Sequence, residues 1–193
     1  MNLVNLHYLN VFLGMGAILL QILSVAVLFL LFFVSLNKKN RNSYFLDYIK
    51  KHFLILGFLV SFMSVLFSLV YSEILNFLPC QLCWFQRIFL FPVVFIFAVA
   101  LWGNSKDKEI EIKNVVKYAT PLLTVGFIIS VYQNFVYYFV PDNALSCDSS
   151  GVSCFTKNIS EFGGYISIPM LSLASFLALF TLVLVAHFYK KKL

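Results

Sequence analysis

The chain has 193 residues, of which 61% are hydrophobic and 11% charged, with a formal net charge of +6. A soluble domain carries about 25% charged residues, so this composition indicates a membrane protein. The length allows one compact bundle of membrane helices, and we expect residues 1–193 to form a single membrane domain.

Apolar stretches long enough to cross a bilayer core of roughly 30 Å recur along the chain. They run over about residues 9–36, 53–72, 80–102, 118–140 and 166–188. This pattern predicts an all-α fold, a polytopic membrane helical bundle. We expect outer loops over 73–79 and 141–165, and inner loops over 37–52 and 103–117.

The first apolar stretch could be a cleaved signal peptide or a retained helix. It is longer than a signal-peptide core, and its basic residues Lys38, Lys39 and Arg41 follow it rather than precede it. We therefore expect a retained helix whose N-terminus lies outside.

The positions of the basic residues predict the orientation in the membrane. Twelve of the 14 lysines and arginines fall in the two inner loops and the C-terminal tail. Cytoplasmic loops are enriched in such residues, so we expect the C-terminus in the cytoplasm and all the cysteines outside, where disulfides persist. Because topology accounts for the basic charge, we reject nucleic-acid binding.

A Cys-x-x-Cys pair opens the third apolar stretch, directly after Pro79. A helix that starts at this proline would place Cys80 and Cys83 on neighbouring positions of its first turn. Arg87 would lie on the same face, about 6 Å deeper. A helix N-terminus and a guanidinium both favour a thiolate, and a charge inside a membrane helix usually has a function. The stretch predicts a redox dithiol, with a static disulfide as an alternative.

The remaining cysteines, Cys147 and Cys154, lie in the long outer loop, separated by a polar spacer. Such a loop closes easily, because closure entropy grows slowly with loop length. The pair could be a simple staple, but a functional pair is favoured since it shares the outer side with Cys80 and Cys83. A zinc site would need all four cysteines as permanent thiolates. An oxidising compartment works against that, so we expect no metal.

Two segments carry a family resemblance. The run Cys80-Gln81-Leu82-Cys83-Trp84-Phe85-Gln86-Arg87, two later outer cysteines, and Ile166-Ser167-Ile168-Pro169-Met170-Leu171-Ser172-Leu173 resemble the bacterial disulfide bond formation protein B (DsbB) family, particularly its BdbC-like branch. The likeness covers roughly residues 50–190 and implies a four-helix core in the bacterial cytoplasmic (inner) membrane. The first helix would then be additional.

The resemblance also implies an activity and residue roles. The protein would reoxidise a DsbA-like thioredoxin-fold oxidase and pass the electrons to a membrane quinone, ubiquinone or menaquinone. Cys83 would face the quinone with Cys80 as its exchange partner, and Arg87 matches the quinone-site arginine. Cys147 would form the mixed disulfide with the oxidase, and Cys154 would be the cysteine that this step releases.

Three amides, Gln86, Gln133 and Asn134, are open to two interpretations. They could form ordinary hydrogen bonds between helices, or they could touch a ligand. The family often carries a histidine near the outer end of its penultimate helix, and Gln133 is the local candidate here. We take Gln86 and Gln133 as candidate quinone contacts.

Two rival classes remain. A vitamin K epoxide reductase-like enzyme has a similar helical bundle and similar redox-active cysteines, but its reactive Cys-x-x-Cys is expected near a late helix. Here the pair opens the third apolar stretch and precedes the other cysteines. The other rival, a non-enzymatic scaffold or small transporter, predicts disulfides that stay oxidised whatever the quinone supply.

Overall fold

The computed structural model describes residues 3–36, 44–103, 107–139 and 164–189. Its helices are α1 (Leu3–Leu36), α2 (Tyr44–Lys51), α3 (Phe53–Leu69), the π-helical turn η1 (Val70–Ile74), α4 (Gln81–Trp102), α5 (Lys108–Phe139) and α6 (Ile168–Phe188). Five helical spans in this described part are long and apolar enough to cross a membrane. The predicted all-α polytopic bundle is confirmed.

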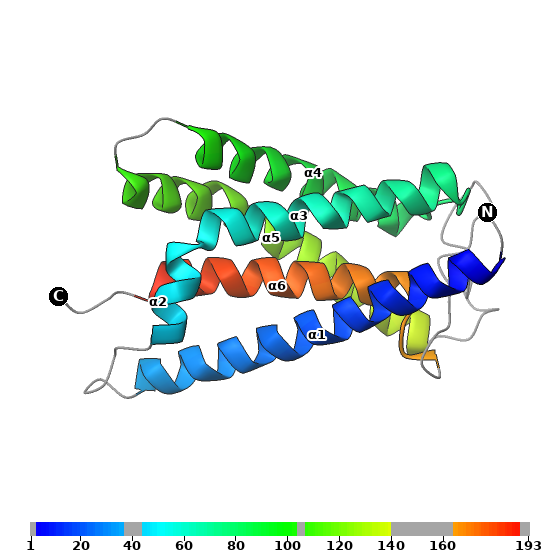
Figure 1. The fold of residues 1–193 in the computed structure, drawn as a ribbon, viewed down its shortest axis with the longest axis horizontal. Helices are drawn as coiled ribbons and strands as arrows, with labels where there is room; N and C mark the ends of the chain where they lie inside the picture. The colour runs from blue at the N-terminus through cyan, green and yellow to red at the C-terminus, as the bar shows by residue number, and fades with distance from the viewer. Residues whose placement is uncertain (1–2, 37–43, 104–106, 140–163, 190–193) are drawn as a thin grey trace.

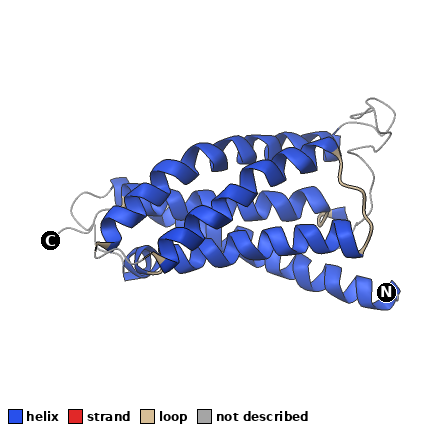
Figure 2. Ribbon diagram, turned by 90° about the horizontal axis from the view of Figure 1, so that it is seen from above, coloured by secondary structure: helices blue, strands red, loops and turns tan. Residues whose placement is uncertain are grey.

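Helix α6 lies at the centre of the arrangement. It packs against α1, α3 and α5, and α4 packs against α3 and α5 (Figures 1 and 2). The apolar core between α3, α4, α5 and α6 is built around large side chains that are almost completely buried: Phe53, Phe97, Leu123, Phe176 and Leu179. Close packing of this kind holds membrane helices together, because lipid provides little hydrophobic driving force.

Two glycines allow the closest helix contacts in this core. A Cβ atom built at Gly57 of α3 would lie 2.1 Å from the ring of Phe97 on α4. A Cβ at Gly126 of α5 would lie 2.3 Å from the ring of Phe176 on α6. Small residues at such interfaces let the helices approach closely. Each glycine therefore accommodates one buried aromatic ring.

The additional helix α1 is attached to the rest of the bundle near both ends. Near its C-terminal end, Val27 joins an apolar cluster with Leu46 and Ile49 of α2 and Val185 of α6. Near its N-terminal end, the buried side chain of Asn10 accepts a 2.7 Å hydrogen bond from the hydroxyl of Tyr71 in η1. Helix α1 is thus an integral part of the fold.

Two expectations about the inner loops were wrong. Helix α5 begins at Lys108, although residues up to 117 were expected to form a loop. Glu109 and Glu111 lie in its first turn, where carboxylates interact favourably with the helix dipole, and Val115 is buried on the core side. Residues 44–51 of the other inner loop form α2, which is anchored by buried apolar side chains.

Helix boundaries also differ at two other places. Helix α1 begins at Leu3, earlier than the expected residue 9. Helix α4 begins at Gln81, so Cys80 is the N-cap residue and Pro79 precedes the helix instead of lying in its first turn. The cysteine pair nevertheless keeps its place at the start of this helix, which continues unbroken through Pro92.

The contact between Gly126 and Phe176 leads to a stability prediction. The substitution Gly126→Val should lower the free energy of unfolding by about 1–3 kcal/mol, because the added side chain overpacks a buried interface. The measurement is thermal unfolding of the detergent-solubilised protein. Gly16→Ala is the control, since a Cβ at Gly16 meets no described atom within 4 Å. Equal stability of Gly126→Val and Gly16→Ala would contradict the packing argument.

Candidate functional site

The cysteine pair lies at the start of α4, where the chain turns from extended into helical backbone. Cys80 is the N-cap residue, with φ −71° and ψ 168°, and its carbonyl accepts the backbone hydrogen bond of Trp84. Cys83 lies in the first turn, so the sulfur atoms of Cys80 and Cys83 are 3.1 Å apart. The two sulfurs are therefore close enough for thiol–disulfide exchange chemistry within the pair.

The guanidinium of Arg87 lies one turn beyond Cys83 and is largely buried. Its Nε donates to the hydroxyl of Ser68 at 2.9 Å, and its Nη2 donates to the carbonyl oxygen of Ser68 at 2.7 Å. The Cζ atom also lies 5.3 Å from the centroid of the Trp84 ring. These contacts, all within the protein, hold a positive charge close to the cysteines.

A chain of hydrogen bonds ends on the two sulfur atoms. The hydroxyl of Ser172 on α6 donates to Gln86 Oε1 at 2.7 Å, and Gln86 Nε2 donates to Gln133 Oε1 at 2.7 Å. Gln133 Nε2 then donates to Cys80 Sγ at 3.4 Å and to Cys83 Sγ at 3.3 Å. Each donor therefore points toward the sulfurs, an arrangement that favours negative charge there.

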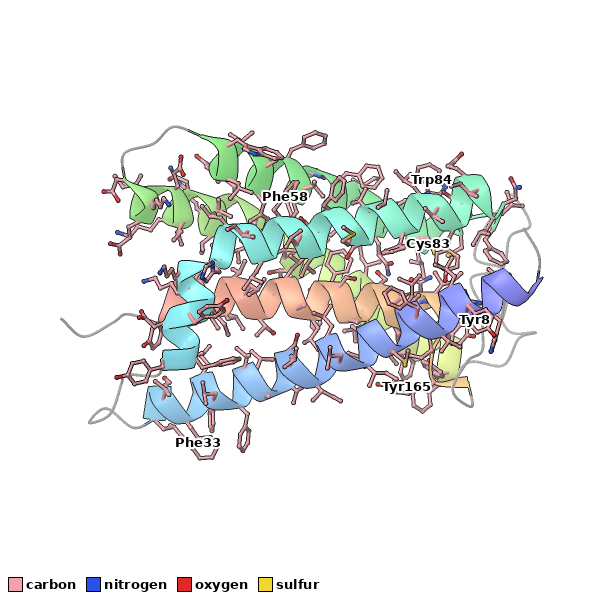
Figure 3. The ribbon with its side chains drawn as sticks, viewed as in Figure 1. Tyr8, Phe33, Phe58, Cys83, Trp84 and Tyr165 are labelled. Atoms are coloured by element: carbon pink, nitrogen blue, oxygen red, sulfur yellow. The ribbon has the colours of Figure 1, made fainter. Side chains whose placement is uncertain are left out.

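These groups line one end of a cavity of about 860 Å³. The sulfurs, Arg87 and Gln133 form its polar end, and the rest is lined mainly by apolar side chains of α1, α3 and α6, with several serines among them. Figure 3 shows Cys83 at the same end of the bundle as Tyr8 and Tyr165. The arrangement can hold a largely apolar molecule with a few polar atoms directed at the dithiol.

The structure brings together five residues that the sequence singled out: Cys80, Cys83, Gln86, Arg87 and Gln133. Cys147 and Cys154 lie outside the described residues. Asn134 donates to the carbonyl oxygens of Ser130 and Pro169, and so connects α5 to the start of α6. For Asn134, the prediction of a hydrogen bond between helices is confirmed.

The sequence reasoning missed several serines of the site. Ser68 supports Arg87, and Ser172 begins the hydrogen-bond chain. A signal was present, because Ser64, Ser68 and Ser72 recur every four residues in an apolar stretch and therefore share one helix face. All three line the cavity. No comparable signal in α1 identified its contribution to the cavity.

The link between Gln133 and the sulfurs leads to a reactivity prediction. Gln133→Leu removes the donors, so the thiolate of Cys83 should form less readily and alkylation of the reduced protein should slow about five- to thirtyfold. Rates are measured with a small alkylating reagent at fixed pH, followed by mass spectrometry.

Ser130→Ala is the matched control on the same helix, because the buried Ser130 hydroxyl finds no hydrogen-bond partner among the described residues. If both variants react at the wild-type rate, the amide of Gln133 has no influence on the thiolate.

Comparison with protein families matches residues 50–186 to the family described as "Disulfide bond formation protein DsbB". The chain is 36% identical over 144 residues to "Probable disulfide formation protein C 2" of Bacillus anthracis, covering 75% of this chain and 96% of the relative. It is 35% identical over 127 residues to "Disulfide bond formation protein C" of Bacillus subtilis, covering 65% of this chain and 85% of the relative.

A third relative is "Probable disulfide formation protein" of Chlamydia trachomatis, 38% identical over 142 residues, covering 73% of this chain and 96% of the relative. The search of solved structures found no match. The predicted resemblance, including its BdbC-like branch, is confirmed. With its dithiol at the start of a membrane helix, this chain belongs to the DsbB family of disulfide bond formation oxidoreductases.

Proposed function

We propose that the protein is a membrane protein-dithiol:quinone oxidoreductase that reoxidises a DsbA-like thioredoxin-fold oxidase outside the cytoplasm. The observation that carries the proposal is the dithiol of Cys80 and Cys83 at the polar end of a large apolar cavity, beside a buried guanidinium. The distribution of lysines and arginines supports an outside N-terminus and a cytoplasmic C-terminus in a bacterial cytoplasmic membrane.

The residues that line the cavity fit a lipid quinone, ubiquinone or menaquinone. A volume of about 860 Å³ lies within the range of sites for small ligands, and the lining is mainly apolar with a few convergent polar groups. Arg87 and the amides of Gln86 and Gln133 carry N–H groups that suit carbonyl oxygens. A bound quinone would supply the acceptor for two electrons and two protons.

The chain's own residues would perform thiol exchange before that transfer. The partner's thiolate attacks the Cys147–Cys154 disulfide and forms a mixed disulfide with Cys147, which releases Cys154 as a thiolate. The freed Cys154 thiolate attacks the Cys80–Cys83 disulfide, which forms an interloop disulfide with Cys80 and releases the Cys83 thiolate. The partner's second thiol attacks the mixed disulfide, so the partner leaves oxidised, and the released Cys147 thiolate then closes the Cys147–Cys154 disulfide and leaves Cys80 and Cys83 reduced.

The structure suggests how Cys83 would be kept reactive at that point. The start of α4 and the N–H groups of Gln133 favour a thiolate on sulfur. Arg87, held by Ser68, would stabilise negative charge that develops in the cavity. Apolar side chains from several helices would exclude water from the reacting groups.

The proposed function predicts that quinone controls the redox state of Cys80 and Cys83. In reconstituted vesicles, reduced protein should regain its disulfide within one turnover when an oxidised quinone is added, and should stay reduced without it. The measurement is trapping with a thiol-specific mass tag. A pair that stays oxidised or reduced regardless of quinone would contradict the proposal and favour a structural role.

A second test concerns Arg87. Arg87→Gln should slow quinone turnover by raising the activation free energy by about 1–3 kcal/mol, the range for losing a charge-assisted hydrogen bond. Single-turnover oxidation of the partner by fully oxidised protein should be spared, since it needs only the outer pair. Arg87→Lys retains the charge without the forked geometry and should show an intermediate loss. Unchanged quinone kinetics in folded Arg87→Gln protein would reduce Arg87 to a structural residue.

A further inference from the structure

Helix α1 lies outside the matched family region, yet it forms a wall of the cavity. The family match begins at residue 50, whereas α1 ends at Leu36. Side chains and backbone of α1 between Phe12 and Leu20 line the same cavity as Cys83. The family comparison therefore gives no role for this wall, which is a property of this chain.

The opposite wall is α3, and α6 forms the floor between them. Helix α6 packs against both α1 and α3, and it lies between them in Figure 1. Lining residues extend from Leu59 of α3 to Ser72 of η1, about 20 Å along the helix axis at roughly 1.5 Å per residue. We call this space the α1–α3 cleft: its lining comes from residues 12–20 of α1, 59–68 of α3, and Tyr71 and Ser72 of η1.

The α1–α3 cleft opens toward the lipid-facing surface. On the α1 side, Phe12, Met15 and Leu19 line the cavity and are also exposed on the surface of the chain. On the α3 side, Leu59 and Met63 do the same. Since these side chains are apolar and lie within candidate membrane spans, the opening faces hydrocarbon. A molecule could enter sideways from the bilayer.

The wall formed by α1 is fixed in position around this opening. The Asn10–Tyr71 hydrogen bond lies on one side of residues 12–20, and the apolar cluster around Val27 lies on the other. Gly16 lies midway along the wall, and a Cβ there would meet no described atom within 4 Å. The open space beside Gly16 is therefore part of the cleft.

We propose that the α1–α3 cleft is the binding channel for the isoprenoid tail of a lipid quinone, with α1 as the wall that makes this chain selective for long-tailed quinones. The inference rests on the proposed function. The cleft is continuous with the polar end at Cys83 and Arg87, so a quinone ring placed there would direct its tail along α3. The apolar lining and the lateral opening suit a polyprenyl chain and no water-soluble ligand.

The first experiment compares a long-tailed quinone with a tail-less analogue. Gly16→Leu should lower the ratio of kcat/KM for the long-tailed over the tail-less quinone about tenfold, because it overpacks the channel. Ala26→Leu is the matched control on an exposed position of the same helix, away from the cavity lining, and should leave the ratio unchanged. A ratio unchanged in folded Gly16→Leu protein would overturn the proposal.

A second measurement needs no variant and no turnover. A long-tailed quinone with a photoreactive group on its tail should label residues 12–20 of α1 in the wild-type chain in vesicles. Excess unlabelled long-tailed quinone should suppress the labelling more effectively than the tail-less analogue. Labelling confined to other helices would overturn the proposal. Labelling of α1 that excess quinone cannot displace would also overturn it, because it would show non-saturable contact rather than binding at a site.

These outcomes separate the two proposals. If neither quinone reoxidises the dithiol of the wild-type chain, the proposed function itself fails. If both quinones do so and α1 is neither labelled nor sensitive to Gly16→Leu, the function stands and the channel fails.

Discussion

The guanidinium of Arg87 must be solvated by the protein, because the hydrocarbon core of a membrane offers no water for the task. Ser68 meets this requirement with both its hydroxyl and its carbonyl oxygen. The carbonyl of a helical residue normally accepts a bond from its own helix, so the second contact also links the backbone of α3 to α4. The charge therefore determines how these two helices sit together at the site, and the start of α4 carries the cysteines with it.

The hydrogen-bond chain from Ser172 to the sulfurs imposes a second constraint. It takes one residue from each of α6, α4 and α5, so the three helices must keep their relative positions for the chain to form. An amide at position 133 presents N–H donors and does not change its charge near neutral pH, unlike a histidine. In this chain the amide beside the sulfurs can therefore stabilise negative charge on them without itself changing charge.

Much of the fold and of the inner site could be predicted from the sequence. Long uncharged runs located the membrane helices, and the spacing of Cys80, Cys83 and Arg87 placed them together because helical periodicity is local. The start of α5 was missed because charged residues can occupy a helical turn that extends beyond the membrane span. The pairing of Gln86 with Gln133 and the wall formed by α1 depend on how separate helices pack, which no local pattern contains.

The π-helical turn η1 allows one segment to serve both the dithiol site and the additional helix. Ser68 contacts α4, whereas Tyr71, three residues later, bonds to Asn10 on α1. In a regular α-helix, residues three apart lie on nearly the same face. The π-helical turn that begins at Val70 has backbone hydrogen bonds between residues five apart instead of four. The segment from Ser68 to Tyr71 therefore contacts α4 through Ser68 and α1 through Tyr71.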